Sequence, residues 1–371
     1  MKITSLYLKN FRNYKEQFVT FGDNLNFIYG KNAQGKTSLL EAFSLFMTGR
    51  SFKTSHLADC IHWGEKHFFL EIIFKKFDID QSLSFFFDRK GKKILYNTTP
   101  LPTLSTLPGI LPGVILHPDH VHLIKGSPAE RRSFLDLQLI QSDPFYLYHF
   151  SRYNRSLKNR NTLLKIKNFA SIEVWEEQLA IAGAYLIQAR SSLINLINQK
   201  SQEFHQSFWG FHEQLEVIYK PGIKENNSFE KKELILLLNR SFQKLRSKEA
   251  ELGNTLTGPH RDDMIILNQE KAALAFSSTG QQRCCTASLK FAEYAILSDR
   301  LKDIRPVMCI DDPETSLDNE RAENLCKEIP ESGQMFISSP QLRSSLPPST
   351  HLLQVIAGSI QEHSLLTCPV A

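Results

Sequence analysis

The stretch that decides the fold reads Gly30-Lys31-Asn32-Ala33-Gln34-Gly35-Lys36-Thr37 and fits the pattern G-x-x-x-x-G-K-[ST] of a phosphate-binding loop. The apolar run 25–29 precedes it and indicates a buried strand, while residues 37–46 follow it with apolar side chains at helical spacing. A strand, a glycine-rich loop and a helix are the context that this motif requires. We therefore interpret the stretch as a phosphate-binding loop rather than as a chance glycine turn before a helix.

The residue types of this loop suit a nucleoside triphosphate. Glycines allow backbone N–H groups to turn inward around phosphates, and the N-terminus of the following helix adds a partial positive charge. Lys36 would reach the β- and γ-phosphates, and the Thr37 hydroxyl would hold Mg²⁺. All eight residues are thus candidate nucleotide-binding residues, Lys36 is also a candidate catalytic residue, and ATP or GTP is the expected ligand.

The composition is that of an ordinary globular protein. Of its residues, 42% are hydrophobic and 22% are charged. The length of 371 residues is enough for two domains or for one domain with a large insertion. The net charge of +5 is too small to name nucleic acid as a partner by itself. The six cysteines form no C-x-x-C pair, and we find no signal peptide and no run long enough to span a membrane. We expect a cytoplasmic protein with reduced thiols and no membrane contact.

Strand patterns dominate the first third of the chain. Residues 3–11 and 18–21 indicate a pair of strands, and an antiparallel meander is expected over residues 68–74, 82–87 and 94–96. The proline-rich stretch 100–112 indicates an irregular crossover, followed by a buried strand at 114–116. Near the C-terminus, residues 352–356 could form an edge strand.

Helical patterns replace the strand patterns from about residue 119 to about residue 252, where the sequence indicates few strands. One apolar face follows three- and four-residue steps through Trp175, Leu179, Ala182, Leu186, Ala189, Leu193 and Ile197. Because further motifs of the nucleotide site follow only afterwards, we predict a helical insertion rather than a separate tandem domain. The predicted boundaries are 1–118 for the first part of an ATPase head, 119–252 for the inserted lobe and 253–371 for the second part of the head.

An apolar strand ending in two acids supplies the second half of the site at residues 307–312. Mg²⁺ on phosphates takes oxygen ligands, and one carboxylate usually helps through a bound water, a role for which Asp311 is the candidate. Asp312 could polarise the attacking water as a general base. A strand followed by a turn is the alternative for these residues alone, and the upstream loop favours the functional interpretation.

The stretch 277–283, Ser-Ser-Thr-Gly-Gln-Gln-Arg, precedes a predicted helix and resembles the Ser-x-Gly-Gln signature of ABC-type ATPases. Thr315-Ser316-Leu317-Asp318 follows the two acids at the spacing of the D-loop of that class. There, the signature of one subunit closes on the γ-phosphate held by another subunit, so Ser278, Gly280 and Gln281 would bind ATP across a homodimer. A simple helix cap is the alternative for Ser278.

Basic residues crowd one predicted helix, with Tyr148, Phe150 and Tyr153 nearby. They are Arg152, Arg155, Lys158, Arg160, Lys165 and Lys167, of which the first four are our candidate DNA contacts. Contacts of this kind bind the phosphate backbone and read no base sequence. A solvated helix face explains the spacing equally well. His260 has no partner ligands at useful spacing and is interpreted as a structural histidine beside a turn.

Several short stretches along the chain match family motifs. They are residues 39–42, Leu8-Lys9-Asn10-Phe11-Arg12-Asn13-Tyr14, Gly49-Arg50-Ser51-Phe52-Lys53-Thr54, Leu123-Ile124-Lys125-Gly126-Ser127-Pro128, Arg131-Arg132-Ser133-Phe134-Leu135-Asp136, Arg160-Asn161-Thr162-Leu163-Leu164 and Gly258-Pro259-His260-Arg261-Asp262-Asp263. Together with the phosphate-binding loop, these stretches closely resemble the RecF family of bacterial recombination and repair ATPases, which are related to SMC proteins.

The resemblance implies an α/β fold, namely an ABC-type P-loop ATPase head with a mixed sheet and helices, carrying an inserted α-helical lobe. It implies ATP and Mg²⁺ as cofactors, an ATP-dependent homodimer and slow, DNA-stimulated ATP hydrolysis. It also implies binding to duplex DNA and to junctions of single-stranded and duplex DNA without sequence specificity. By the same resemblance, the partners are RecR and RecO, and the roles are RecA loading in DNA replication, recombination and repair and in the SOS response.

The chain departs from the family pattern at three places. His117-Pro118-Asp119-His120-Val121 stands where the family usually has Ser-Pro-Glu-Asp-Leu, in the loop that would sense the γ-phosphate. Thr315 replaces the usual serine of the D-loop, and Ser338-Ser339 stands at the switch position where ABC transporters use histidine. Two other classes remain as alternatives, the ATPase subunit of a transporter and a small-molecule kinase, and stimulation of ATPase activity by duplex DNA would separate the first of these from a DNA-repair role.

Overall fold

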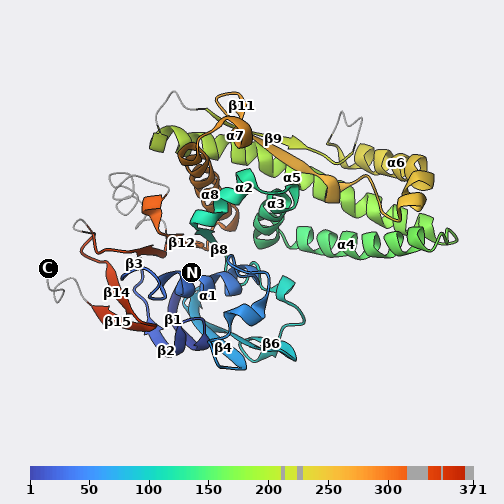
Figure 1. Cartoon of the computed structure of the whole chain (residues 1–371). Coiled ribbons are helices and arrows are strands. Elements are labelled where there is room, and N and C mark those ends of the chain that lie inside the picture. The colour runs from blue at the N-terminus through green and yellow to red at the C-terminus, as the bar shows by residue number, and fades with distance from the viewer. Residues whose placement is uncertain (210–213, 224–228, 316–332, 344–345, 364–371) are drawn as a thin grey trace. The chain divides into compact units, whose positions relative to one another are not determined.

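The computed structural model describes residues 1–209, 214–223, 229–315, 333–343 and 346–363 (Figure 1). By its internal contacts the chain divides into two compact units, unit 1 with residues 1–120 and 293–371 and unit 2 with residues 121–292. The first junction lies close to the predicted boundary at residue 118. The second lies 40 residues beyond the predicted boundary at 252, because residues 253–292 pack with the helical lobe. The assignment of head and lobe by residue range stays a prediction.

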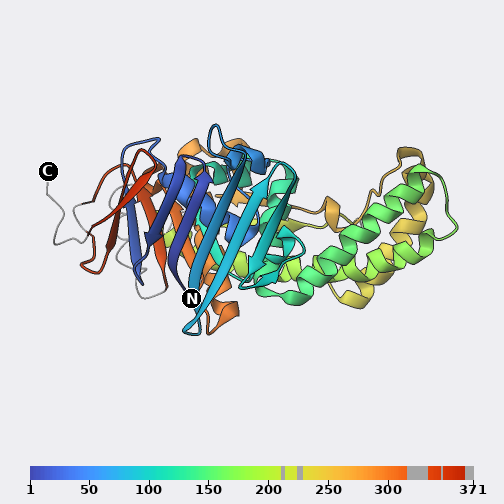
Figure 2. The ribbon, with the colours of Figure 1, turned by 90° about the horizontal axis from the view of Figure 1, so that it is seen from below.

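One sheet of unit 1 is antiparallel and has the strand order β2-β1-β4-β5-β6-β7. Figure 2 shows its blue and cyan strands side by side. The strands alternate buried and less buried residues, as expected for a sheet with one face on the core. The predicted strand pair and meander are confirmed, and the strands are β1 (Lys2–Phe11), β2 (Tyr14–Thr20), β4 (His67–Lys76), β5 (Ile79–Asp88), β6 (Gly91–Tyr96) and β7 (Thr99–Pro100).

The second sheet of unit 1 is mixed and has the order β15-β14-β3-β13-β12-β8. Five of its strands are parallel, and only β15 runs antiparallel. The predicted edge strand at 352–356 exists as β14 but is not an edge, because β15 covers its outer side. The strands are β3 (Leu25–Tyr29), β8 (Gly113–Leu116), β12 (Val307–Asp311), β13 (Met335–Ser339), β14 (His351–Ile356) and β15 (Ser359–His363).

Helix α1 (Lys36–Thr48) shares one hydrophobic core with side chains of both sheets of unit 1. Eleven of its 13 residues are buried, which explains why its sequence is apolar on nearly all sides. The helix ends at Gly49, whose φ of 70° is a left-handed conformation that glycine adopts without strain. Short 3₁₀ segments complete the connections of unit 1, at Leu57–Cys60, Leu104–Thr106, Pro118–Val121 and Pro313–Thr315.

Unit 2 is mainly helical, with α4 and α6 packed along α5 (Figure 1). Its helices are α2 (His122–Lys125), α3 (Pro128–Ser142), α4 (Pro144–Lys165), α5 (Ile172–Trp209), α6 (Lys231–Leu252) and α7 (Ala273–Phe276), and α8 (Thr279–Leu301) begins in this unit. On the expected apolar face of α5, Trp175 and Ala189 are only partly buried. The other members are buried as predicted, namely Leu179, Ala182, Leu186, Leu193 and Ile197.

Unit 2 also contains a three-stranded sheet that the sequence did not predict. Its order is β11-β10-β9, with strands β9 (Leu215–Lys220), β10 (Asp263–Asn268) and β11 (Lys271–Ala272). Residue 215 of β9 pairs with residue 268 of β10, so the pairing joins segments that are about 50 residues apart. Such a short strand gives a weak local signal when its partner lies far along the chain.

Helix α5 also corrects our expectation that no run is long enough to cross a membrane. Residues Ile172–Ser207 are long and apolar enough to cross a membrane, because an 18-residue window within them has a mean hydropathy of 1.2. However, 56% of the most apolar window is buried inside the protein, and the core helix of a globular protein passes the same test. The helix is therefore weak evidence for a membrane span.

Acidification should weaken the fold of unit 2 through His205 of α5. Its side chain is 1% exposed, its Nδ1 atom lies 3.0 Å from the Ser288 hydroxyl, and burial lowers its pKa to about 4. Since the unfolded chain keeps a pKa near 6.5, stability is complete above pH 6.5 and is lost as the pH falls toward 4. We expect the free energy of unfolding in urea to fall by about 1–2 kcal/mol more between pH 7.5 and pH 5.0 in the wild type than in His205→Asn. Equal losses would contradict the buried neutral histidine.

Candidate nucleotide-binding site

The phosphate-binding loop connects β3 to α1 and needs its glycines for two reasons. Gly30 and Gly35 have φ angles of 153° and 125°, which side-chain-bearing residues rarely adopt. A Cβ atom on Gly30 would also lie 2.3 Å from the carbonyl oxygen of Val355 in β14. The glycines of the predicted motif are therefore required by the backbone of the loop and by its close approach to the neighbouring strand.

Lys36 begins α1 and turns its amino group back over the loop. Its Nζ atom donates to the carbonyl oxygens of Gly30 at 2.7 Å and Lys31 at 3.2 Å, and the residue is only 4% exposed. Within the described part of the chain, no side chain caps the N-terminus of α1 at Gly35. Backbone N–H groups of an uncapped first turn are natural ligands for an anion, so the loop has the features of a phosphate site.

Oxygen atoms converge where β12 ends beside the loop. The Thr37 hydroxyl lies 3.2 Å from Oδ1 of Asp311, and the Ser338 hydroxyl donates to the same carboxylate oxygen. Asp311 is 3% exposed, and Ser338 pairs with it across the adjacent parallel strands β12 and β13. A hydroxyl and a carboxylate are hard oxygen donors of the kind that Mg²⁺ prefers, so Thr37 and Asp311 fit the group expected there.

His117 is a further partner of Asp311 that the sequence analysis did not identify. Its Nε2 atom lies 3.3 Å from Oδ2 of Asp311, and its Nδ1 atom accepts a hydrogen bond of 3.1 Å from the backbone N–H of Asp119. The proton of the neutral ring is therefore on Nε2, which donates to Asp311. The ring lies 4.5 Å from that of Phe52, and burial lowers the pKa of His117 although Asp311 raises it. The unusual histidine of the 117–121 loop thus orients the predicted magnesium ligand.

Asp312 follows β12 in an uncommon conformation, with a φ of 44°. Aspartate tolerates this left-handed region better than most residues. Its backbone N–H donates to the Ser338 carbonyl oxygen at 3.2 Å, which ties this conformation to the end of the neighbouring strand β13. Burial and the neighbouring Asp311 raise the pKa of Asp312 to about 6, while Lys36 opposes the shift. A carboxylate of raised basicity beside a phosphate loop is suited to general-base chemistry.

Residues outside the motif hold the loop in shape, and the sequence analysis did not predict these contacts. The Tyr14 hydroxyl donates to the Gly35 carbonyl at 3.0 Å, and the Asn13 side chain donates to the Ala33 carbonyl at 3.1 Å. At the turn between β14 and β15, the backbone N–H groups of residues 357 and 358 donate to the side chain and carbonyl of Gln34, at 2.6 and 3.0 Å. Backbone donors of this kind leave no sequence signal.

The candidate signature lies in unit 2 at the start of α8. Ser278 and Gln281 form reciprocal hydrogen bonds, from the Ser278 N–H to Gln281 Oε1 at 2.9 Å and from the Gln281 N–H to Ser278 Oγ at 3.2 Å. The helix cap that we considered as an alternative is therefore real. Ser278, Gly280 and Gln281 are all exposed, so a second molecule could reach them. Of the candidate D-loop, Ser316, Leu317 and Asp318 lie outside the described residues.

The four candidate DNA contacts all lie on helix α4, but they differ in their exposure to solvent. Arg155 and Lys158 are exposed, and Arg152 is partly exposed. Arg160 is 0% exposed, so our prediction that it contacts DNA is wrong for this fold. Its position in the helix turns it to the face that also buries Tyr153 and Leu164.

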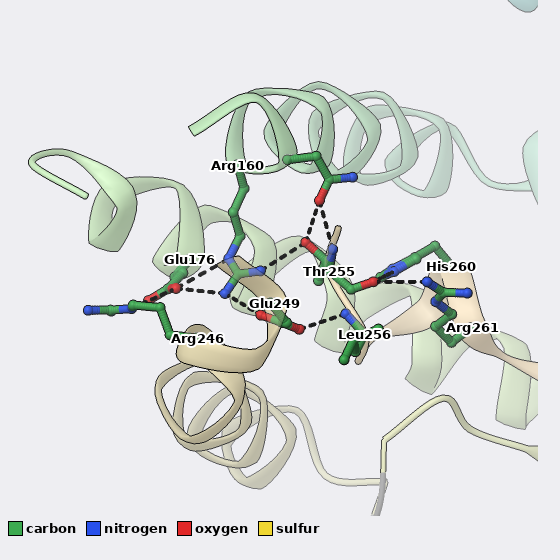
Figure 3. Close-up of polar contacts among 9 residues, drawn as sticks. Arg160, Glu176, Arg246, Glu249, Thr255, Leu256, His260 and Arg261 are labelled. Atoms are coloured by element: carbon green, nitrogen blue, oxygen red, sulfur yellow. Dashed lines mark hydrogen bonds and ion pairs between the residues drawn. The ribbon is translucent and has the colours of Figure 1, made fainter. Parts of the chain in front are cut away.

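Arg160 is the centre of a buried ion-pair network in unit 2 (Figure 3). Its Nη2 atom lies 2.7 Å from Glu249 and 2.8 Å from Glu176, and its Nη1 atom donates to the Thr255 hydroxyl at 2.9 Å. Arg246 pairs with Glu176 from the other side at 2.6 Å. The network joins α4, α5, α6 and the segment before η4 (Pro259–Arg261), so these residues stabilise the lobe.

Arg160→Ala should therefore destabilise unit 2 rather than weaken DNA binding selectively. Without the Arg160 side chain, the carboxylate of Glu249, which is also 0% exposed, is a buried charge without its cation. We expect this to lower the free energy of unfolding by about 3–5 kcal/mol. Urea unfolding followed by circular dichroism would measure the loss. Arg155→Ala is the matched control, because that arginine is exposed on the same helix and should change stability by less than about 0.5 kcal/mol. A normally stable Arg160→Ala would contradict the structural role.

His260 has the structural environment that its sequence context predicted. Its Nδ1 atom lies 2.6 Å from the Tyr153 hydroxyl, and its Nε2 atom lies 3.0 Å from the Thr255 carbonyl. Burial lowers its pKa to about 4, so the ring is neutral at physiological pH. Within the described residues there is no group of three or more His, Cys, Asp or Glu side chains that could hold a metal ion.

Comparison with known proteins agrees with this geometry. A family model for an AAA domain matches residues 5–294. The DNA replication and repair protein RecF of Protochlamydia amoebophila is 43% identical over 339 residues, covering 91% of this chain and 94% of the relative. RecF of Chlamydia caviae is 40% identical and covers 99% of both chains.

Solved structures show the same likeness. The recombination mediator protein RecF-ATP of the RecFOR pathway has a TM-score of 0.90 at 29% identity, with 98% of both chains covered. An Smc head bound to the C-winged helix domain of ScpA has a TM-score of 0.58 at 17% identity, a likeness of fold alone. The chain thus has an ABC-type ATPase fold, which it shares with SMC heads. Among proteins with this fold, the chain belongs to the RecF family of DNA replication and repair proteins.

Proposed function

We propose that this protein is an ATP-switched DNA-binding repair protein whose two copies close on DNA when ATP binds and separate after hydrolysis. One observation carries the proposal: Lys36, Thr37 and Asp311 meet at the uncapped start of α1. One of the similar proteins of known structure is the recombination mediator protein RecF-ATP, which supports ATP as the ligand. Membership in the RecF family also argues against the transporter and kinase alternatives.

The loop residues 30–37 would hold the phosphates of ATP. Lys36 is already buried with its amino group on two loop carbonyls, so a phosphate oxygen could replace these acceptors with little rearrangement. Thr37 and Asp311 would hold Mg²⁺, with Ser338 and His117 orienting the carboxylate. The bound ion would neutralise charge on the β- and γ-phosphate oxygens.

Asp312 would act as the general base that accepts a proton from the attacking water. Its raised pKa of about 6 leaves it mostly ionised at pH 7 and basic enough for this role. Ser278, Gly280 and Gln281 of a second copy would complete the pocket, because these residues are exposed at the start of a long helix, whose N-terminal partial positive charge suits an anion. ATP binding and dimer formation would then be one event.

The DNA ligand would be duplex DNA and junctions between single-stranded and duplex DNA, bound without sequence specificity. Membership in the RecF family and the exposed Arg155 and Lys158 of α4 support this choice. By relation to the RecFOR pathway, RecO and RecR would be partners in loading RecA in the cytoplasm. Participation in recombination and in the SOS response is part of the same proposal.

Light scattering of the full chain tests the proposal, with and without ATP, Mg²⁺ and a gapped duplex. We expect a monomer without ATP, a dimer with ATP, and a dimer that carries DNA when all components are present. Faster ATP turnover on adding duplex DNA would support the link between the two ligands. A monomer under every condition would overturn the clamp, and ATP turnover that is indifferent to DNA would overturn its coupling to DNA.

A further inference from the structure

Helix α4 exposes aromatic side chains where a folded surface normally buries them. Phe145 is 71% exposed and Tyr148 is 55% exposed. Arg152 and Arg155 follow Tyr148 at steps of four and three residues, and the exposed Lys158 comes one turn later. The outer face of α4, defined here as Phe145, Tyr148, Arg152, Arg155 and Lys158, is thus a strip of aromatic and basic groups about 20 Å long.

The charge of this segment is uniform. Residues 144–171 contain no aspartate or glutamate but six lysines and arginines, of which only Arg160 is buried. Clusters of one sign repel each other and would be unfavourable without a counter-charge. A polyanion is therefore the complementary ligand for the outer face of α4.

The aromatic and basic groups of the strip are held together. The Arg152 guanidinium lies over the Tyr148 ring, 5.9 Å from its centroid, and donates to the Tyr148 hydroxyl at 2.7 Å. Another hydrogen bond joins Arg152 to Gln178 of α5. The Tyr148 ring thus keeps a defined orientation although more than half of it is exposed, which lowers the entropy that a stacking contact would cost.

A second aromatic group adjoins the strip. His149 stacks on Tyr185 of α5 at 4.3 Å, and Lys231 of α6 lies 5.7 Å from the centroid of that tyrosine. Burial lowers the pKa of His149, the positive charges of Lys231 and Arg152 lower it further, and Asp143 opposes the shift. Three helices therefore contribute to the same combination of rings and cations.

We propose that the outer face of α4 is a binding surface for single-stranded DNA, which adds a named site to the DNA-binding function proposed above and rests on it. Unpaired bases stack on Phe145 and Tyr148, and the backbone phosphates pair with Arg155 and Lys158. Base stacking on aromatic side chains needs bases that are free of a duplex, which distinguishes this ligand from double-stranded DNA. The site would hold the single-stranded arm of a gapped substrate.

Charge favours this ligand over a protein partner. The cores of protein–protein interfaces are depleted in lysine, whereas aromatic rings beside a stripe of cations are the common arrangement in single-strand binding proteins. An acidic protein that covers the strip is nevertheless a possible result of the test below.

The test measures the affinity of the full chain, with ATP and Mg²⁺, for three fluorescent probes: oligo-dT, a duplex of the same length and a gapped duplex. Tyr148→Ala should weaken oligo-dT binding by about five-fold or more, and Tyr148→Phe should retain most of it because the ring remains. Leu236→Ala on α6 is the matched control, since that side chain is 57% exposed but lies outside the strip. Duplex affinity should change much less in Tyr148→Ala than oligo-dT affinity.

A second measurement locates the contact directly. Oligo-dT carrying one 5-iododeoxyuridine should cross-link to Tyr148 or Phe145 on irradiation, because this base reacts with the ring on which it stacks. If the wild type binds none of the three probes, the proposed function fails. If it binds them and Tyr148→Ala binds oligo-dT equally well without cross-links in α4, only the single-strand site fails, and the strip would then be a surface for a protein partner.

Discussion

Lys36→Ala is expected to lose ATP binding while the protein stays folded. Lys36 is 4% exposed and its amino group already lies at the loop, so its contact with the phosphates would be a charge-assisted hydrogen bond in a nearly dry site. Each such bond contributes about 1.5–3 kcal/mol, and two of them correspond to at least about a 100-fold loss of affinity. Isothermal titration with ATP and Mg²⁺ measures the change.

Two controls make the Lys36 result specific. Lys75→Ala removes an exposed lysine of β4 and should leave the affinity for ATP unchanged. Thermal unfolding should show a folded Lys36→Ala protein, since the carbonyl oxygens of Gly30 and Lys31 regain water when the amino group is absent. An affinity for ATP close to that of the wild type would contradict the assignment of the phosphate-binding loop.

The phosphate site could be predicted because its signals are local. The strand, loop and helix around Gly30–Thr37 are contiguous, and the strand ending in Asp311 carries its own apolar pattern. Order along the chain then sufficed to place β12 near the loop, because parallel strands of such a sheet bring their carboxyl ends to one edge. The 3.2 Å contact between Thr37 and Asp311 agrees with that prediction.

Arg160 shows where sequence reasoning failed. Counting charges along α4 could not reveal which arginine turns inward, because its acidic partners are 16 and 89 residues away. Its spacing from Tyr153, seven residues or two turns, was available and does indicate a shared face. That signal becomes decisive only when the tyrosine is known to be buried.

The contact of His117 with Asp311 and the contacts of the turn at residues 357–358 were missed for different reasons. A histidine in a loop has many possible roles, and only the fold brings His117 to Asp311, 194 residues away. The contacts of the turn with Gln34 are made by backbone N–H groups, which every residue except proline carries. Side-chain chemistry at a predicted site is thus more readily predicted than the framework that supports it.

Asp312→Asn should abolish most ATP hydrolysis while ATP binding remains. The amide has almost the same shape as the carboxylate but cannot accept the proton of the attacking water, and loss of a general base lowers a rate by about 100- to 10,000-fold. Binding should be retained or tightened, because the change removes a negative charge next to Asp311 and Lys36 at the phosphate end of the loop. Single-turnover assays with radiolabelled ATP measure the chemical step.

The same variant should collect in the ATP-bound dimer, because hydrolysis is the step that would separate the two copies. Light scattering with ATP and Mg²⁺ should therefore show a longer-lived dimer for Asp312→Asn than for the wild type. Asp311→Asn is the matched comparison, since its carboxylate would bind the ion rather than the water, and its main defect should be weaker Mg²⁺-dependent ATP binding. If Asp312→Asn hydrolyses ATP at the wild-type rate, the base is another group, and if it never dimerises with ATP, hydrolysis does not control the clamp.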